Sequence, residues 1–410
     1  MKRYVIVGNG VAAARCVEGI RSADQTGEIT VISEENRAVY CRPLISYYLE
    51  GKTDLARMRY RGEDFYARTG CEVLYGRRAV KIRRDTKEVE LDDGALLPYD
   101  ELCLATGSVP FVPPFKGLET VPRPFSFMTL DDALALEKAL RKTSRVLIVG
   151  AGLIGLKCAE GICERVASIT VCDLADRVLS SILDADCAAM MQKCLESHGI
   201  SFLLGDSVER FESDRAHMRS GKTVDFDILV LAVGVRANTA LIKEIGGATD
   251  RGVLVDASMK TSVEHIYAAG DCAQGPDASS GQNRVLAILP NASLQGYTAG
   301  VNMAGGARTF EKGIPMNSIG FFGLHAMTAG SYEGECYEEK TETSLKRLFT
   351  KDDRLAGFIL IGCGERAGIY TSMIREKTPL SSVNFELLKK GATTAAFSAD
   401  QRRKKFGGVV

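Results

Sequence analysis

The chain has 410 residues, enough for two or three domains, and its 52 basic and 52 acidic residues give a formal net charge of zero. This balance removes the electrostatic basis for binding nucleic acid or an anionic membrane, so neither is expected as a partner. The apolar runs are strand-sized, the first begins too early to leave room for a signal peptide, and twelve scattered cysteines fit a reducing compartment, so we expect a globular, cytoplasmic protein.

The first predicted strand runs into a glycine-rich turn. Tyr4 to Val7 are apolar, and Gly8-Asn9-Gly10-Val11-Ala12-Ala13 follow as the opening of a helix. The first glycine permits the turn, the second lets the backbone approach a pyrophosphate, and the third small residue lets helix and strand pack closely. A second strand at 29–32 leads to Glu34, which is placed to accept a hydrogen bond from a ribose. The predicted dinucleotide-binding residues of this turn are Gly8, Gly10, Val11, Ala12 and Ala13.

A second turn of the same kind lies further along the chain. Strand 146–149 is followed by Gly150-Ala151-Gly152-Leu153-Ile154-Gly155, and strand 169–172 leads to Asp173. Two dinucleotide sites in one chain suggest that a hydride passes from one dinucleotide to the other. The predicted binding residues of this turn are Gly150, Gly152, Leu153, Ile154, Gly155 and Asp173.

The two halves match again further on, which indicates two copies of one nucleotide-binding domain. Leu104-Ala105-Thr106-Gly107 and Leu231-Ala232-Val233-Gly234 each follow an apolar strand. They add Ala105, Thr106 and Gly107 to the first site and Gly234 to the second. A further apolar strand, 265–269, ends in Gly270-Asp271 beyond both copies, so we expect the chain to return to the first domain there.

The predicted fold class is α/β, with two Rossmann-like dinucleotide-binding domains of which the first is interrupted by the second. We expect the first at 1–112 and 245–314 and the second at 113–244, with the proline-rich stretch 110–124 as the crossover. Thr129 is the expected cap of a helix in the second domain.

Residues 315–410 are predicted to form a small α+β domain. Strands at 345–350 and 355–361 flank a turn at 351–354, which indicates a hairpin, and a helix is expected over about 365–376.

These motifs make the chain resemble the FAD-dependent pyridine nucleotide oxidoreductases. Within them it is most similar to NADH:rubredoxin reductases and to the flavin-binding part of assimilatory nitrite reductases. The resemblance covers nearly the whole chain and rests on both glycine turns and on Tyr40 to Ser46, Ala105-Thr106-Gly107, Ala269-Gly270-Asp271, Leu289 to Ala292 with Gln295-Gly296, and Gly364 to Tyr370.

The resemblance implies FAD at the first turn and a nicotinamide nucleotide at the second. It implies that Glu34 or Glu35 binds the adenosine ribose, that Arg42 lies near the flavin, and that Asp271 binds the ribityl chain. Ala79 and Val80 are implied to contact the adenine through their backbone. At the second turn the Asp173 carboxylate favours NADH over NADPH, because it repels a 2′-phosphate.

Several positions depart from the pattern of the relatives. Pro43 occupies the redox-cysteine position of the disulfide reductases, and Val11 replaces a histidine of the oxidase and peroxidase branch, which disfavours disulfide and peroxide chemistry. Cys41 is then either a redox thiol or an incidental cysteine. Relatives usually carry a glutamate where this chain has Lys157, and often a lysine where it has Tyr47. Lys157 either points outward as a surface lysine or brings its ammonium close to the isoalloxazine, where it favours the reduced, anionic flavin.

The expected function is oxidation of NADH by an FAD enzyme that passes electrons to a small redox protein of the rubredoxin or ferredoxin kind. One alternative is a self-contained NADH oxidase or small-molecule reductase. Another is a non-catalytic electron-transfer subunit of a larger iron–sulfur complex, which the changes at Lys157 and Tyr47 favour. No metal-ligand spacing stands out, so no metal is expected, and a homodimer through the last domain is possible by analogy.

Overall fold

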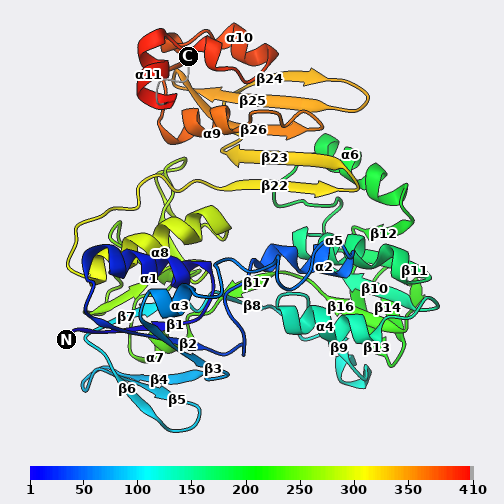
Figure 1. Ribbon diagram of the computed structural model, residues 1–410. Helices are drawn as coiled ribbons and strands as arrows, with labels where there is room; N and C mark the ends of the chain where they lie inside the picture. Colours follow the sequence, from blue (N-terminus) through cyan, green and yellow to red (C-terminus); the bar gives the residue numbers. More distant parts are fainter. Residues whose placement is uncertain (407–410) are drawn as a thin grey trace. The chain divides into compact units, whose positions relative to one another are not determined.

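The computed structural model describes residues 1–406, with side chains through residue 403, and the chain divides into two compact units. Unit 1 comprises Met1–Ser181, Ala188–Pro276 and Asn283–Phe310, and unit 2 comprises Ile182–Cys187, Asp277–Gln282 and the chain from Glu311 onward. Both glycine turns lie in unit 1 (Figure 1). The boundaries predicted at 112, 244 and 314 divide the chain more finely and stay a prediction.

A parallel five-stranded sheet in unit 1 carries the first glycine turn. Its order is β19-β7-β1-β2-β3, with bounds Ile266–Ala268, Glu101–Leu104, Arg3–Val7, Glu28–Ser33 and Cys71–Tyr75. The central strands are almost continuously apolar because a parallel sheet is buried on both faces. The strands predicted at 4–7 and 29–32 are present, and the strand before Gly270-Asp271 pairs with β7 in this same sheet.

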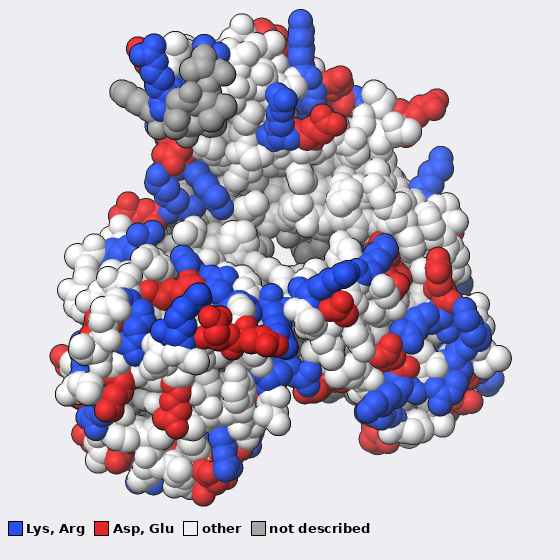
Figure 2. Space-filling model, viewed as in Figure 1, with Lys and Arg blue, Asp and Glu red and all other residues white. Residues whose placement is uncertain are grey.

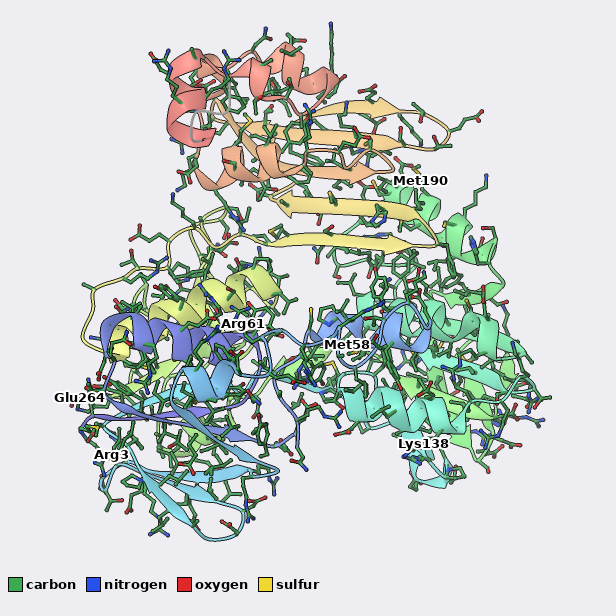
Figure 3. The ribbon with its side chains drawn as sticks, viewed as in Figure 1. Arg3, Met58, Arg61, Lys138, Met190 and Glu264 are labelled. Carbon is green, nitrogen blue, oxygen red and sulfur yellow. The ribbon has the colours of Figure 1, made fainter. Side chains whose placement is uncertain are left out.

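A second five-stranded sheet in unit 1 repeats this arrangement. Its order is β12-β11-β10-β16-β9, with bounds Ile200–Leu204, Ser168–Asp173, Arg145–Val149, Ile228–Leu231 and Pro124–Phe125. The repeat extends to side chains at the start of each central strand. The Asp100 carboxylate accepts from the backbone N–H of Arg3 at 2.7 Å and from the Arg3 Nη2 at 2.9 Å (Arg3 is labelled in Figure 3). In the second sheet, the Asp227 carboxylate accepts from the backbone N–H of Arg145 at 2.7 Å and from the Arg145 Nη2 at 2.9 Å.

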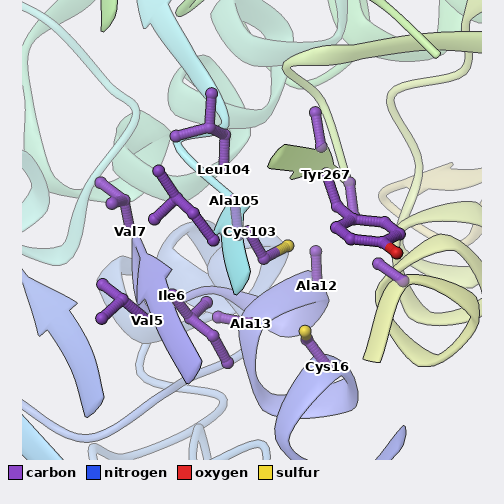
Figure 4. Packing of buried hydrophobic residues seen from close by; sticks show 14 of the residues in the cluster. Val5, Ile6, Val7, Ala12, Ala13, Cys16, Cys103, Leu104, Ala105 and Tyr267 are labelled. Atoms are coloured by element: carbon purple, nitrogen blue, oxygen red, sulfur yellow. The ribbon is translucent and has the colours of Figure 1, made fainter. Parts of the chain in front are cut away.

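Glycines bring helices α1 (Val11–Ala23) and α8 (Leu289–Met303) into backbone contact. A Cβ added to Gly296 would lie 2.1 Å from the carbonyl oxygen of Ala12, and one added to Gly300 would lie 2.1 Å from that of Cys16. Figure 4 shows the buried core beneath this crossing, where Ala12, Ala13 and Cys16 of α1 face the first sheet. The position of α1, and of the glycine turn that opens it, is therefore fixed by α8.

Two antiparallel segments connect the sheets. β8 (Ser108–Pro110) pairs with β17 (Val235–Ala237), the backbone N–H of Asn238 donates to the Gly107 carbonyl at 2.9 Å, and the Thr106 hydroxyl donates to the Asn238 carbonyl at 2.8 Å. The chain leaves the first sheet along β8 and returns along β17, which places one crossover at the start of the proline-rich stretch.

The other elements of unit 1 surround these sheets. Three small sheets consist of β4 (Ala79–Arg83), β5 (Glu88–Leu91) and β6 (Leu96–Pro98); β13 (Val208–Glu212), β14 (Arg215–Met218) and β15 (Thr223–Asp225); and β18 (Val253–Leu254), β20 (Ala273–Pro276) and β21 (Asn283–Val285). The helices before residue 311, besides α1 and α8, are α2 (Ile45–Leu49), α3 (Phe65–Arg68), α4 (Leu130–Ala139), α5 (Leu153–Ile162), α6 (Ala185–Glu196) and α7 (Ala240–Glu244). Thr129 caps α4 in a capping box with Asp132, as predicted.

Unit 2 contains an antiparallel sheet in the order β22-β23-β26-β25-β24. Its elements are β22 (Met316–Phe321), β23 (Leu324–Gly330), β24 (Glu335–Lys340), β25 (Leu345–Lys351), β26 (Arg354–Ile361), α9 (Gly368–Arg375), α10 (Phe385–Lys390) and α11 (Ala399–Phe406). The predicted hairpin is β25–β26, and its turn residues Asp352 and Asp353 have φ of 50° and 56°, as a primed turn needs. The helix expected from about 365 begins only at Gly368, because Arg366 has a left-handed φ of 55°.

Within residues 1–406, no helix combines the length and apolar character needed to cross a bilayer.

Candidate functional site: two dinucleotide cradles

The first glycine of each turn is required by the packing of the chain itself. Gly8 and Gly150 have φ of 107° and 116°, a region that side chains rarely adopt. A Cβ on Gly8 would lie 2.2 Å from the carbonyl oxygen of Ala105, and one on Gly150 would lie 2.2 Å from that of Ala232. The third glycine of the second turn, Gly155, is equally constrained, since its Cβ would lie 2.0 Å from the Gly150 carbonyl oxygen.

The second glycine of each turn has a different explanation. Gly10 and Gly152 have ordinary φ values of −94° and −83°, and a Cβ added to either would meet no described atom of the chain within 4 Å. Each precedes the first turn of a helix, whose leading N–H groups have no intrahelical partner and form a positive pole. No contact with the described residues requires glycine at these two positions, whereas a pyrophosphate resting on the helix N-terminus does. The residues present therefore fit a dinucleotide at both turns.

Each glycine turn, together with the N-terminus of the helix that follows it (α1 for the first, α5 for the second), is called a cradle below. Asp173 lies at the end of β11, beside the second cradle. Its Oδ2 accepts from the backbone N–H of Ala151 at 2.7 Å, and its Oδ1 accepts from the N–H of Ala175 at 2.8 Å. Each carboxylate oxygen can accept a second hydrogen bond. Asp173 is thus held against the glycine turn with acceptor capacity left for ribose hydroxyls.

The corresponding acid of the first cradle is less obvious. Strand register makes Ser33, the last residue of β2, the equivalent of Asp173. Glu34 follows and is exposed, whereas Glu35 accepts from the Tyr40 hydroxyl at 2.8 Å and from Arg42 Nη2 at 2.6 Å. Because Glu35 is the ion-pair partner of Arg42, whereas Asp173 accepts only from backbone N–H groups, Glu34 is the better candidate for the adenosine ribose.

Tyr40 joins the loop after β2 to helix α4. Its hydroxyl donates to Glu35 and accepts from the backbone N–H of Leu130 at 2.8 Å, and the residue is 8% exposed. Burial raises the pKa of Tyr40, so the hydroxyl keeps the proton that it donates.

We expect Tyr40→Phe to lower the free energy of unfolding by about 1–3 kcal/mol, because it leaves the buried N–H of Leu130 without an acceptor. Urea denaturation measures the change. Tyr75→Phe is the matched control, since Tyr75 is 38% exposed. Equal stability of the two variants would rule out a structural role for the Tyr40 hydroxyl.

The charge of Arg42 acts on the Asp271 carboxyl. Burial raises the pKa of Asp271, and the nearby Arg42 guanidinium opposes that shift. Asp271 follows Gly270, whose N–H donates to the buried Gln295 Oε1 at 2.9 Å. Gln295 Nε2 is also buried and has no hydrogen-bond partner among the described residues. This is the arrangement expected of a donor that hydrogen-bonds a ligand when the ligand is bound. In the sequence, Gln295 belongs to one of the motifs that carry the resemblance, and no role of its own is predicted for it.

The other predicted binding residues lie in three different places: Val80 is on β4 of a small sheet, Gly107 follows β7 of the first sheet, and Gly234 follows β16 of the second sheet. Val80 lies where the pairing of β4 with β5 shifts register between Ala79 and Lys81, so its backbone groups fall outside the regular ladder. That arrangement suits a backbone contact to adenine. Gly107 and Gly234, at corresponding places in the two halves, have φ of 64° and 112°.

Lys157 and Tyr47 also meet. The Lys157 side chain is 19% exposed, pairs with Glu160 one turn further along α5, and places Nζ 4.7 Å from the centroid of the Tyr47 ring. Lys157 is therefore not directed into open solvent. Its relation to a flavin stays a prediction.

Cys41 does not have the environment of a reactive thiol. Burial raises its pKa, whereas thiol chemistry needs the thiolate. All twelve cysteines are free, and no group of three or more potential metal ligands was found within the described residues. Acidic and basic side chains are interspersed over the face shown in Figure 2.

Comparison with known proteins agrees with this geometry. The model of a family described as pyridine nucleotide-disulphide oxidoreductase matches residues 2–296. The NADH-dependent phenylglyoxylate dehydrogenase subunit epsilon of Aromatoleum evansii is 32% identical over 92% of this chain and 93% of its own length. Nitrite reductase [NAD(P)H] of Bacillus subtilis (strain 168) is 29% identical over 98% of this chain, which spans only 51% of that protein.

Among solved structures, a putidaredoxin reductase–putidaredoxin complex is similar in fold. It superimposes with a TM-score of 0.86 at 24% identity over 95% of each chain.

Proposed function

The chain belongs to the pyridine nucleotide-disulphide oxidoreductase family, and we propose that it is an FAD-dependent oxidoreductase that oxidises NADH and passes the electrons to a small redox protein. The observation that carries the proposal is the pair of cradles whose second glycines, Gly10 and Gly152, leave open the space of a pyrophosphate. When bound, FAD would supply the chemistry, by accepting a hydride and releasing electrons singly.

The first cradle would hold FAD. The N-terminus of α1 would bind its pyrophosphate, Glu34 its adenosine ribose, and Val80 its adenine through the backbone. Asp271 would bind the ribityl chain, and Arg42 keeps a positive charge beside that carboxyl. The buried amide of Gln295 offers a further donor at the same place.

The second cradle would hold NADH. The N-terminus of α5 would bind the pyrophosphate, and the Asp173 carboxylate would accept from the ribose hydroxyls while it repels a 2′-phosphate. Asp173 is already fixed by the Ala151 and Ala175 N–H groups, so little ordering is needed when the nucleotide binds.

Asp173→Ala is expected to reduce the preference for NADH over NADPH by roughly tenfold to 100-fold, because a charge-assisted hydrogen bond of about 1.5–3 kcal/mol and a repulsive charge are both lost. The ratio of kcat/KM for the two nucleotides measures this. Asp176→Ala is the control, since that side chain is 79% exposed. An unchanged ratio in Asp173→Ala would contradict the assignment.

The A. evansii relative, a named subunit of an NADH-dependent dehydrogenase, favours a second candidate function. In it this chain would be the flavoprotein subunit of a larger complex, exchanging electrons with an iron–sulfur partner rather than with a diffusing acceptor. A cytoplasmic location is part of both proposals, and the free cysteines support it.

The two functions, and an NADH oxidase, are separated by one steady-state experiment. The purified chain is given NADH alone under air, then NADH with a rubredoxin or a ferredoxin under argon. Reduction of the redox protein at a rate far above oxygen consumption supports the proposal. Rapid oxygen consumption alone indicates an oxidase, and slow turnover with every acceptor indicates a subunit that needs its complex.

A further inference from the structure

Helix α5 buries a carboxylate that the proposed function has not used. Glu160 is 5% exposed and lies among the apolar residues of that helix. A buried carboxylate is costly unless it is paired. Here the ammonium of Lys157, one turn earlier on the same helix, is its ion-pair partner, and that ammonium lies 4.7 Å from the Tyr47 ring centroid.

A second pair lies beside the first. Lys52 Nζ is 6.0 Å from the Tyr47 ring centroid and pairs with Glu50. Glu50 first and Glu160 after it raise the pKa of Lys52, so the two pairs share one electrostatic environment. The two ammoniums near the Tyr47 ring are thus each paired with a carboxylate, and these four groups carry no net charge. Burial, and after it the Glu160 carboxylate, raises the pKa of the Cys194 thiol.

This cluster lies where the halves of unit 1 touch. Tyr47 is on α2, which directly follows the turn that carries Arg42, and Lys157 is on α5, two residues after the last glycine of the second turn. The helices are in close contact, since a Cβ on Gly161 would lie 3.0 Å from the carbonyl oxygen of Ser46. The cluster thus lies between the segment that follows Arg42 and the helix that begins at the second glycine turn.

We propose that Glu160 is a positioning residue that holds the Lys157 ammonium on the Tyr47 ring and cancels its charge toward the bound cofactors. This inference rests on the proposed function, because it assumes FAD in the first cradle. An unopposed ammonium would stabilise a negatively charged reduced cofactor and raise its potential. With Glu160 in place, the site presents a neutral pair instead.

The test is the FAD midpoint potential, measured with a chemical reductant and a reference dye, so that it does not depend on NADH. Glu160→Gln should raise the potential, since it removes one negative charge beside Lys157. Lys157→Met should lower it, since it removes one positive charge beside Glu160. The double variant should return close to wild type, and the control Glu164→Gln, an exposed acid just beyond α5, should not shift it.

A Glu160→Gln protein with bound FAD and an unshifted potential would overturn the inference. So would a double variant whose potential stays as far from the wild-type value as that of either single variant. If Glu160→Gln loses FAD, recovery of FAD binding in the double variant supports charge compensation, and loss in both overturns it. A shift in Glu160→Gln together with wild-type flavin that NADH does not reduce would leave this inference standing while the proposed function fails.

Discussion

Gly152→Val is expected to weaken NADH binding roughly 100-fold while leaving the FAD content and the melting temperature unchanged. The backbone at this position is in an extended conformation that valine also adopts, and a Cβ would meet no described atom of the chain within 4 Å. The new side chain would instead occupy the space of the pyrophosphate. Loss of two charge-assisted hydrogen bonds at about 1.5 kcal/mol each corresponds to this factor.

Gly150→Val is the contrasting variant. Its Cβ would lie 2.2 Å from the Ala232 carbonyl oxygen at a φ of 116°, so both stability and NADH binding should fall. Isothermal titration with NADH and a thermal melt of the same samples separate the two effects. Tight NADH binding by Gly152→Val would show that the second turn is a packing device and not a cradle.

Gly296→Ala is expected to destabilise unit 1 by about 3 kcal/mol and to release FAD. Helix propensity alone predicts the opposite, a gain of about 1 kcal/mol, because alanine is the better helix former. We expect the packing to outweigh the helix propensity, because the added methyl would lie 2.1 Å from the carbonyl oxygen of Ala12 and would push α1 away from α8. The first glycine turn directly precedes α1, so the first cradle would move with this helix.

Urea unfolding and the flavin-to-protein absorbance ratio measure both consequences. Ser293→Ala, on the same helix and away from these glycine contacts, should change neither. A stabilised Gly296→Ala protein with full FAD would mean that α1 and α8 can separate at little cost.

The glycine turns could be predicted because their information is local. Strand, turn, helix and second strand follow one another within about 30 residues, as in any βαβ unit. The same pattern recurs 142 residues later, so the assignment of each turn supports that of the other. The spacing also predicted that the strand before Gly270-Asp271 lies outside both copies, and the structure adds it to the first sheet beside β7.

What the sequence could not supply depends on contacts between distant segments. Tyr40 binds the N-terminus of α4 across 90 residues of chain. Lys157 was identified as unusual, but its partner Glu160 is one acid among the 52 acidic residues and has no motif. Choosing between Glu34 and Glu35 needed the positions of Tyr40 and Arg42. Helix α9 begins later than predicted because Arg366 has a left-handed φ. The identity of this residue does not predict that conformation.

The most direct test of the central claim is an anaerobic titration of the purified chain with NADH and then with NADPH, following the flavin absorbance. The two-cradle account predicts that about one NADH bleaches each bound FAD and that NADPH is a much poorer reductant. Bound FAD that NADH leaves oxidised would contradict it, and would mean that the second cradle does not deliver a nicotinamide to the flavin in this chain.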